Sequence, residues 1–167
     1  KMIEDVLSGV GGNGTANYVP KWTDSDTLGD SSIYDNGSVG ISTASPGAKL
    51  HVYDTAGGGD QVLIENTHSA AADAPDVVLY RNSSSPANSD DLGIIRFRGK
   101  NDGTDTGYGE NKVIYADIEA EITSVVSGSE GGTLKLYTQN NGTSASRITI
   151  TGDKVGIGVS TPSVGLE

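Results

Sequence analysis

The clearest pattern along the chain is a strict alternation of apolar and polar residues over Lys112–Thr123. One set of positions holds Ile114, Ala116, Ile118, Ala120 and Ile122, and the other holds Tyr115, Asp117, Glu119 and Glu121. Successive side chains of a β-strand point to opposite faces, so this period of two predicts a long, half-buried strand.

Shorter segments repeat the pattern on both sides of this strand. They are Thr133–Thr138, Arg147–Thr151, Gln61–Glu65, Val77–Arg81 and Leu92–Arg98. We expect the apolar side chains Leu134, Leu136, Ile148 and Ile150 to point inward. Turn-forming residues such as Asn140-Asn-Gly142 separate the segments. Strands at this spacing favour an antiparallel β-sandwich or jelly roll, and nothing indicates the alternating strands and helices of a parallel α/β fold.

One short segment, Lys1–Leu7, has helical spacing, with Ile3, Val6 and Leu7 on one face. Seven residues do not form a stable helix alone. The segment fits the end of a coiled coil at residues 1–8 or a frayed terminus, and the sequence leaves both open.

The composition agrees with an all-β chain that has a small core. Only 36 of the 167 residues are Leu, Ile, Val or Phe, and Val and Ile far outnumber Leu. A small core is easier to reconcile with stability when several chains share it. The net charge of -11 opposes binding to nucleic acid or anionic lipid. The lack of cysteine excludes disulfides and thiolate metal sites, and no apolar run is long enough for membrane insertion.

An internal repeat lies near both ends of the chain. Val39-Gly-Ile-Ser-Thr-Ala-Ser-Pro46 recurs as Val155-Gly-Ile-Gly-Val-Ser-Thr-Pro162 at a constant offset of 116 residues, which Leu50 and Leu166 also keep. The pattern predicts a short strand, a turn at the proline and a second strand. The glycine between Val and Ile leaves room for another backbone to approach closely.

These phrases resemble the stalk repeats of phage tail fibre and tailspike proteins. The resemblance is carried by Gly14-Thr-Ala-Asn-Tyr-Val-Pro-Lys-Trp-Thr-Asp24, Thr27-Leu-Gly-Asp30 and Val155-Gly-Ile-Gly158 with Thr161-Pro162, and it is strongest over residues 11–52 and 147–167. It implies an extracellular virion protein that forms a homotrimer, joins other tail fibre or virion proteins and attaches to the host. Many members end in an intramolecular chaperone domain that cleaves itself off; we do not carry that activity over, because the sequence ends at Glu167.

The fold that follows is an all-β homotrimeric fibre with a sandwich-like or jelly-roll-like knob between two β-stalk connectors. We expect a first connector at residues 9–52, the knob at 53–153 and a second connector at 154–167. The residues expected to pack between chains are Tyr18, Trp22, Val39, Ile41, Val155 and Ile157. Trp22 is the only tryptophan, and a large ring in so apolar-poor a region needs a surface to pack against.

Catalytic, metal and cofactor motifs receive little support, so we expect a protein that is not an enzyme. His51 and His68 fit no triad or metal-ligand spacing. Asp117, Glu119 and Glu121 have a spacing that a glycosidase pair could use. The simpler expectation is a face that is merely solvated, or one paired with basic residues of an adjoining strand such as Arg96 and Arg98. The loop starting at Asp24 has Leu28 where an EF-hand needs its third oxygen ligand, and no phosphate-binding loop is found. A structural cation is left open.

A receptor surface is the more interesting expectation. Tyrosine rings cover the apolar faces of sugars while nearby carboxylates and amides bind hydroxyls. The candidates are Tyr80, Tyr108, Tyr115 and Tyr137, with a host cell-surface glycan as the partner. The alternative is that these rings fill contacts between chains. Two rival functions stay open, a free-standing carbohydrate-binding module and a polysaccharide-degrading tailspike domain.

Overall fold

A computed structural model describes residues 14–69, 74–102 and 112–166, and within them the chain forms nine β-strands and no helix. The all-β prediction is therefore confirmed. The expected coiled-coil end at residues 1–8 lies outside the described residues. No helix in the described part is long and apolar enough to cross a membrane. The chain divides into two compact units, Lys1–Asp76 and Val77–Glu167.

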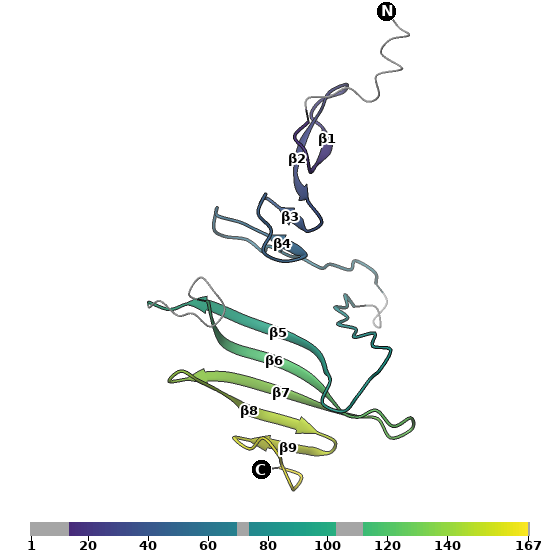
Figure 1. The fold of residues 1–167 in the computed structure, drawn as a ribbon, viewed down its shortest axis with the longest axis vertical. Helices are drawn as coiled ribbons and strands as arrows, with labels where there is room; N and C mark the ends of the chain where they lie inside the picture. Colours follow the sequence, from purple (N-terminus) through teal and green to yellow (C-terminus); the bar gives the residue numbers. More distant parts are fainter. Residues whose placement is uncertain (1–13, 70–73, 103–111, 167) are drawn as a thin grey trace, which may run out of the picture. The chain divides into compact units, whose positions relative to one another are not determined.

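The first unit holds a four-stranded sheet in the order of the sequence (Figure 1). Its strands are β1 (Tyr18–Trp22), β2 (Leu28–Asp35), β3 (Val39–Ile41) and β4 (Leu50–Val52). The β1–β2 and β2–β3 pairs are antiparallel, and β3–β4 is parallel. Asp35-Asn-Gly37 forms the turn between β2 and β3, since Gly37 adopts a φ of 100° and its N–H donates to the Asp35 carboxylate.

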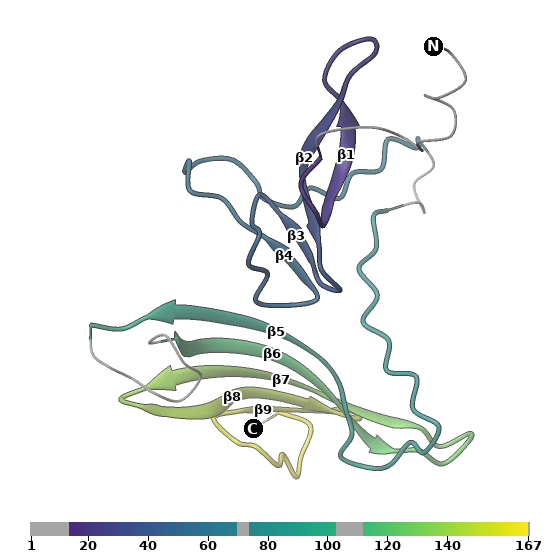
Figure 2. The ribbon, with the colours of Figure 1, turned by 45° about the horizontal axis from the view of Figure 1, so that its top comes forward.

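The second unit is a five-stranded antiparallel meander in which each strand pairs with the next. Its strands are β5 (Asp91–Lys100), β6 (Lys112–Ser124), β7 (Gly131–Asn140), β8 (Thr143–Thr151) and β9 (Lys154–Ile157). Asn141 and Gly142 both have positive φ, 52° and 79°, as a two-residue hairpin turn requires. Figures 1 and 2 show one curved layer. Within the described residues of this unit there is one sheet, so a sandwich would need its second layer from elsewhere.

Two of the predicted strands are wrong. Gln61–Glu65 and Val77–Arg81 have strand-like composition but form no strand, and Val62, Leu63, Val78 and Tyr80 are well exposed. A strand is stable only when its backbone groups pair with a neighbour, and composition cannot show whether one is present. The strands predicted at Leu92–Arg98, Lys112–Thr123, Thr133–Thr138 and Arg147–Thr151 are confirmed as β5 to β8.

The two copies of the repeat adopt the same local structure. Val39 pairs in parallel with Leu50, and Val155 pairs in parallel with Leu166. The N–H of Val39 donates to the Lys49 carbonyl at 2.8 Å, and that of Val155 donates to the Gly165 carbonyl at 2.9 Å. The prediction of a strand, a turn at proline and a return strand is therefore confirmed for the first copy, and in the second copy the return segment forms a single parallel bridge at Leu166.

The glycine inside each repeat has the close neighbour that the sequence predicts. A Cβ on Gly40 would lie 2.1 Å from the Thr43 carbonyl oxygen, and one on Gly156 would lie 2.6 Å from that of Val159. Both distances are far below van der Waals contact, so the turn folds back over a bare glycine. The residues after the strands, Ser42 and Gly158, are both left-handed, with φ of 60° and 74°.

Strand register divides the β5–β9 sheet into an apolar and a polar face. One row across all five strands is Ile95, Ile118, Leu136, Ile148 and Ile157. A row on the other face is Arg96, Asp117, Tyr137 and Ser146. The alternation predicted for β6 holds from Ala116 to Ile122. A bulge opposite Phe97 and Arg98 breaks it, so Ile114 lies opposite Arg98.

Burial in this sheet is the reverse of the usual arrangement. Among the described residues, none of the large apolar side chains is buried, whereas Asp117, Thr133 and Thr149 are, the last with 1% exposure. The expectation that Leu134 and Ile150 point inward is wrong for the single chain, since each is 40% exposed. The apolar side chains share a face as predicted, but among the described residues of this unit no second sheet covers that face. Leu79, which precedes β5, packs over the face at Gly93.

Candidate functional site

The polar face of the β5–β9 sheet is organised around one ion pair. Arg96 on β5 and Asp117 on β6 are direct cross-strand neighbours. The Arg96 Nε donates to Asp117 Oδ1 at 3.0 Å, and its Nη2 donates to Oδ2 at 3.2 Å. This two-pronged geometry fixes both side chains, and the Asp117 carboxylate is almost fully buried. Of the two expectations for this carboxylate, solvation or pairing with a neighbouring arginine, the structure has the pairing with Arg96.

A second charged cluster lies beside the first, around Lys135 on β7. Its ammonium group donates to Glu121 and lies 3.6 Å from Glu119 Oε1. The hydrogen bond with Glu121 raises the pKa of Lys135, and partial burial opposes that effect. Burial is also the main cause that raises the pKa of Tyr137, and the Glu119 charge adds to it.

The alternation over Thr133–Thr138 places Lys135 on the face opposite Leu134 and Leu136 but does not assign it a partner. The register of β6 against β7 sets Glu119 opposite Lys135 and Glu121 opposite Thr133. Only that register brings the three charges together. The spacing of residues within one strand could not have predicted this cluster of Lys135 with Glu119 and Glu121.

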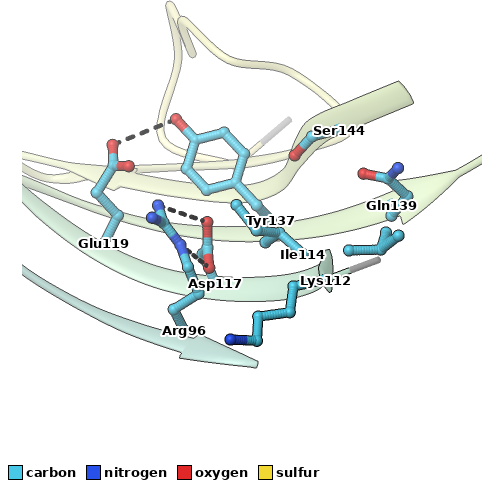
Figure 3. Close-up of a pocket in the computed structure, with 9 residues that line it drawn as sticks. Arg96, Lys112, Ile114, Asp117, Glu119, Tyr137, Gln139 and Ser144 are labelled. Atoms are coloured by element: carbon cyan, nitrogen blue, oxygen red, sulfur yellow. Dashed lines mark hydrogen bonds and ion pairs between the residues drawn. The ribbon is translucent and has the colours of Figure 1, made fainter. Parts of the chain in front are cut away.

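A pocket of about 350 Å³ opens on the polar face (Figure 3). Its lining residues are Arg96, Lys112, Val113, Ile114, Asp117, Glu119, Tyr137, Gln139 and Ser144. The Tyr137 hydroxyl donates to Glu119 Oε1 at 3.4 Å, and Figure 3 shows the ring beside the Arg96–Asp117 pair. Two cations and two carboxylates line the pocket, so their formal charges cancel.

A second hollow of about 520 Å³ adjoins this pocket. It is lined by Asn101, Val113, Tyr115, Gln139, Asn141 and Gly142, and it shares Val113 and Gln139 with the first. The Tyr115 hydroxyl donates to the Lys100 carbonyl at 3.3 Å, and the ring lies against Gly99. Tyr137 and Tyr115 therefore line two adjoining hollows, which together we call the tyrosine groove.

The other two candidate tyrosines are not brought to this groove. Tyr80 is 79% exposed and belongs to no strand, and its hydroxyl lies 3.5 Å from Asn82 Oδ1. Tyr108 lies outside the described residues. The sequence missed the other polar groups of the groove, because Gln139 and Ser144 meet only through the pairing of β7 with β8.

The residues expected to pack between chains occupy both units. Trp22 on β1 and Ile157 on β9 are largely exposed, at 66% and 63%. Val39, Ile41 and Val155 are half-buried within the two repeat units. Tyr18 is also half-buried and meets Tyr34 edge-to-face, with ring centroids 5.2 Å apart.

Within the described residues, one acidic cluster has the spacing of a cation site, but a lysine already pairs with it. Oxygens of Asp91, Glu119 and Glu121 lie within 4.8 Å of one another, but Lys135 already neutralises two of these carboxylates. The Asp24 carboxylate accepts the backbone N–H groups of Asp26 and Thr27, and the first of these bonds is the main cause that lowers its pKa. The Asp24 carboxylate therefore stabilises the turn in which it lies by accepting these two backbone hydrogen bonds.

Comparison with known proteins does not assign the chain to a family. No family model matches the chain, and no curated protein matches it.

Proposed function

We propose that the chain is a structural segment of a homotrimeric phage tail fibre or tailspike. In this role it forms part of the stalk and a knob, joins other tail proteins in the virion and helps to attach the particle to its host. The observation that carries the proposal is the fold without a core: in both units the described large apolar side chains stay at least partly exposed. Such a chain gains stability by sharing its apolar surface with other chains.

The repeat supports the same proposal. The two strand–turn–strand units have the same pairing, the same close carbonyl over glycine and the same left-handed residue. They contain the phrases that resemble phage stalk repeats. A stalk is built from units that recur along its length, whereas a self-contained domain has no need for them.

The test is the native mass in solution, measured by light scattering over a dilution series. We expect a mass near three times 17.1 kDa that persists on dilution. A folded monomer at all concentrations would refute the proposal.

Carbohydrate binding in the tyrosine groove is a second candidate function. The groove combines two tyrosines, amides and carboxylates with a net formal charge near zero in its first pocket, which suits a neutral, hydroxyl-rich ligand. A glycan array probed with the assembled protein tests this function. We expect Tyr137→Ala to abolish any glycan signal and Tyr53→Ala, in the first unit, to leave it unchanged. An equal signal from both variants would exclude the groove.

A further inference from the structure

We propose that the apolar face of the β5–β9 sheet packs against the same face of other copies of this chain. This face is defined by Ile95, Phe97, Ile118, Leu136, Ile150 and Ile157, which share it through the strand register. The inference rests on the proposed function and adds to it the surface that the copies share.

The two faces of the sheet differ sharply in what they offer a partner. The polar face carries its own ion pairs, and its Asp117, Thr133 and Thr149 are already buried. The apolar face keeps Ile95, Phe97 and Ile157 at 50% exposure or more. A contiguous apolar surface of this kind on a folded domain marks a site of association.

The size of the face suits a stable interface. Five strands about 4.8 Å apart, each about nine residues long at about 3.4 Å per residue, give a face of roughly 750 Å². A standard protein interface buries about 800 Å² on each partner. One sheet face therefore has the area that a specific contact between two copies needs.

A second copy of this chain is the occupant that the charge distribution favours. Each copy carries a net charge of -11, so association must keep charged groups apart. The paired rows that define the apolar face contain no charged residue, and the ion pairs of the sheet lie on the opposite face. Arg147, at the bulge in β8, is a charged side chain that reaches the apolar face, where it donates to Thr138 Oγ1 at 3.0 Å. Two apolar sheet faces pack about 10 Å apart in a sandwich. Neighbouring copies would then supply the layer that one chain lacks.

Exposed apolar residues in the first unit favour the same occupant. Trp22 and Leu50 are 66% and 61% exposed there. A second copy carries the same exposed apolar residues in each of its two units, so it can offer a matching surface to either unit. A smaller partner that binds only to the β5–β9 sheet would leave the apolar residues of the first unit exposed.

Single-cysteine labelling of the full chain tests the inference, since the natural sequence has no cysteine. Ile95→Cys and Ile157→Cys place a thiol on the outermost strands of the apolar face. Val126→Cys, in the β6–β7 turn, is the matched control, because Val126 is 62% exposed and Ile157 is 63% exposed in the single chain. The readout is the rate of reaction with a maleimide, with the native mass of each variant measured in parallel.

We expect an assembled protein in which the thiols at 95 and 157 react about tenfold more slowly than the thiol at 126, or slower still. Full assembly with equal rates at all three positions would overturn the inference alone and leave the proposed fibre function intact. A folded monomer with equal rates would overturn both. A monomer in which 95 and 157 are protected would also overturn both, and would identify another part of the same chain as the cover.

Discussion

The substitution Gly156→Ala tests the close approach that defines the repeat unit. The added Cβ would lie 2.6 Å from the Val159 carbonyl oxygen and 3.3 Å from Pro162 Cβ. The carbonyl belongs to the main chain of a turn whose return strand is bonded through Val155 and Gly165, so it cannot rotate away as a side chain would. The methyl group therefore has to displace the turn from β9.

The expected cost follows from these distances. Forcing a methyl group into a closely packed site costs about 1–3 kcal/mol. Replacing glycine by alanine also makes the unfolded chain less flexible, which stabilises by about 0.4–1 kcal/mol. We expect the free energy of unfolding to fall by about 1–2 kcal/mol.

Gly132→Ala is the matched control on β7. A Cβ at Gly132 would have its nearest neighbour, the Glu121 carbonyl oxygen, at 3.7 Å, which is ordinary van der Waals contact. This variant is expected to be as stable as the natural chain or slightly more stable.

The assay is urea unfolding followed by circular dichroism, at one fixed chain concentration because association makes stability depend on concentration. The reasoning would be refuted if Gly156→Ala lay within about 0.5 kcal/mol of Gly132→Ala.

Three further predictions concern the second unit. Lys135→Met should lower stability by about 1–2 kcal/mol at pH 7, because it leaves Glu121 without its partner. The pKa of Lys135 is raised above its ordinary value of 10.5, so its contribution is complete below that value and is lost as the pH rises through the raised one. The gap between natural and variant chains should then be constant from pH 7 to 9 and close in stronger base. Asp117→Asn should cost about 2–4 kcal/mol, since it leaves the Arg96 guanidinium without its carboxylate. Gly142→Val should cost about 1–3 kcal/mol, because a β-branched residue is strained at a φ of 79°.

Each of these variants has a control in the same sheet, measured by the same unfolding assay. Lys154→Met and Asp153→Asn change charges at the β8–β9 turn and should alter stability by less than about 0.5 kcal/mol. Gly142→Asn should cost less than Gly142→Val, because asparagine tolerates positive φ. If a variant and its control lose equal stability, the contact named for that variant contributes nothing specific.

The strands could be predicted wherever a short-range pattern was enough. The alternation in β6 and the Asn-Gly turn between β7 and β8 are local features, and the structure has both. The repeat at an offset of 116 residues predicted two matching strand–turn–strand units, including the bare glycine. These features depend on backbone sterics and side-chain period, which are properties of neighbouring residues.

The candidate site could be predicted only in part. Tyr115 and Tyr137 were chosen for their chemistry, and the structure places them in two adjoining hollows that share Val113 and Gln139. Gln139 and Ser144 were missed, because their meeting depends on how β7 pairs with β8. A bulge turned Ile114 away from the face that its spacing predicted.

The sequence by itself determined the all-β class, four strands of the large sheet, its division into an apolar and a polar face, and the repeat. The tertiary structure decided which charges meet and which predicted strands find partners. It also decided that the apolar face lies open and that Asp117 is buried instead. The reason is that alternation specifies on which side of a strand a residue lies, whereas burial depends on whether another layer covers that side.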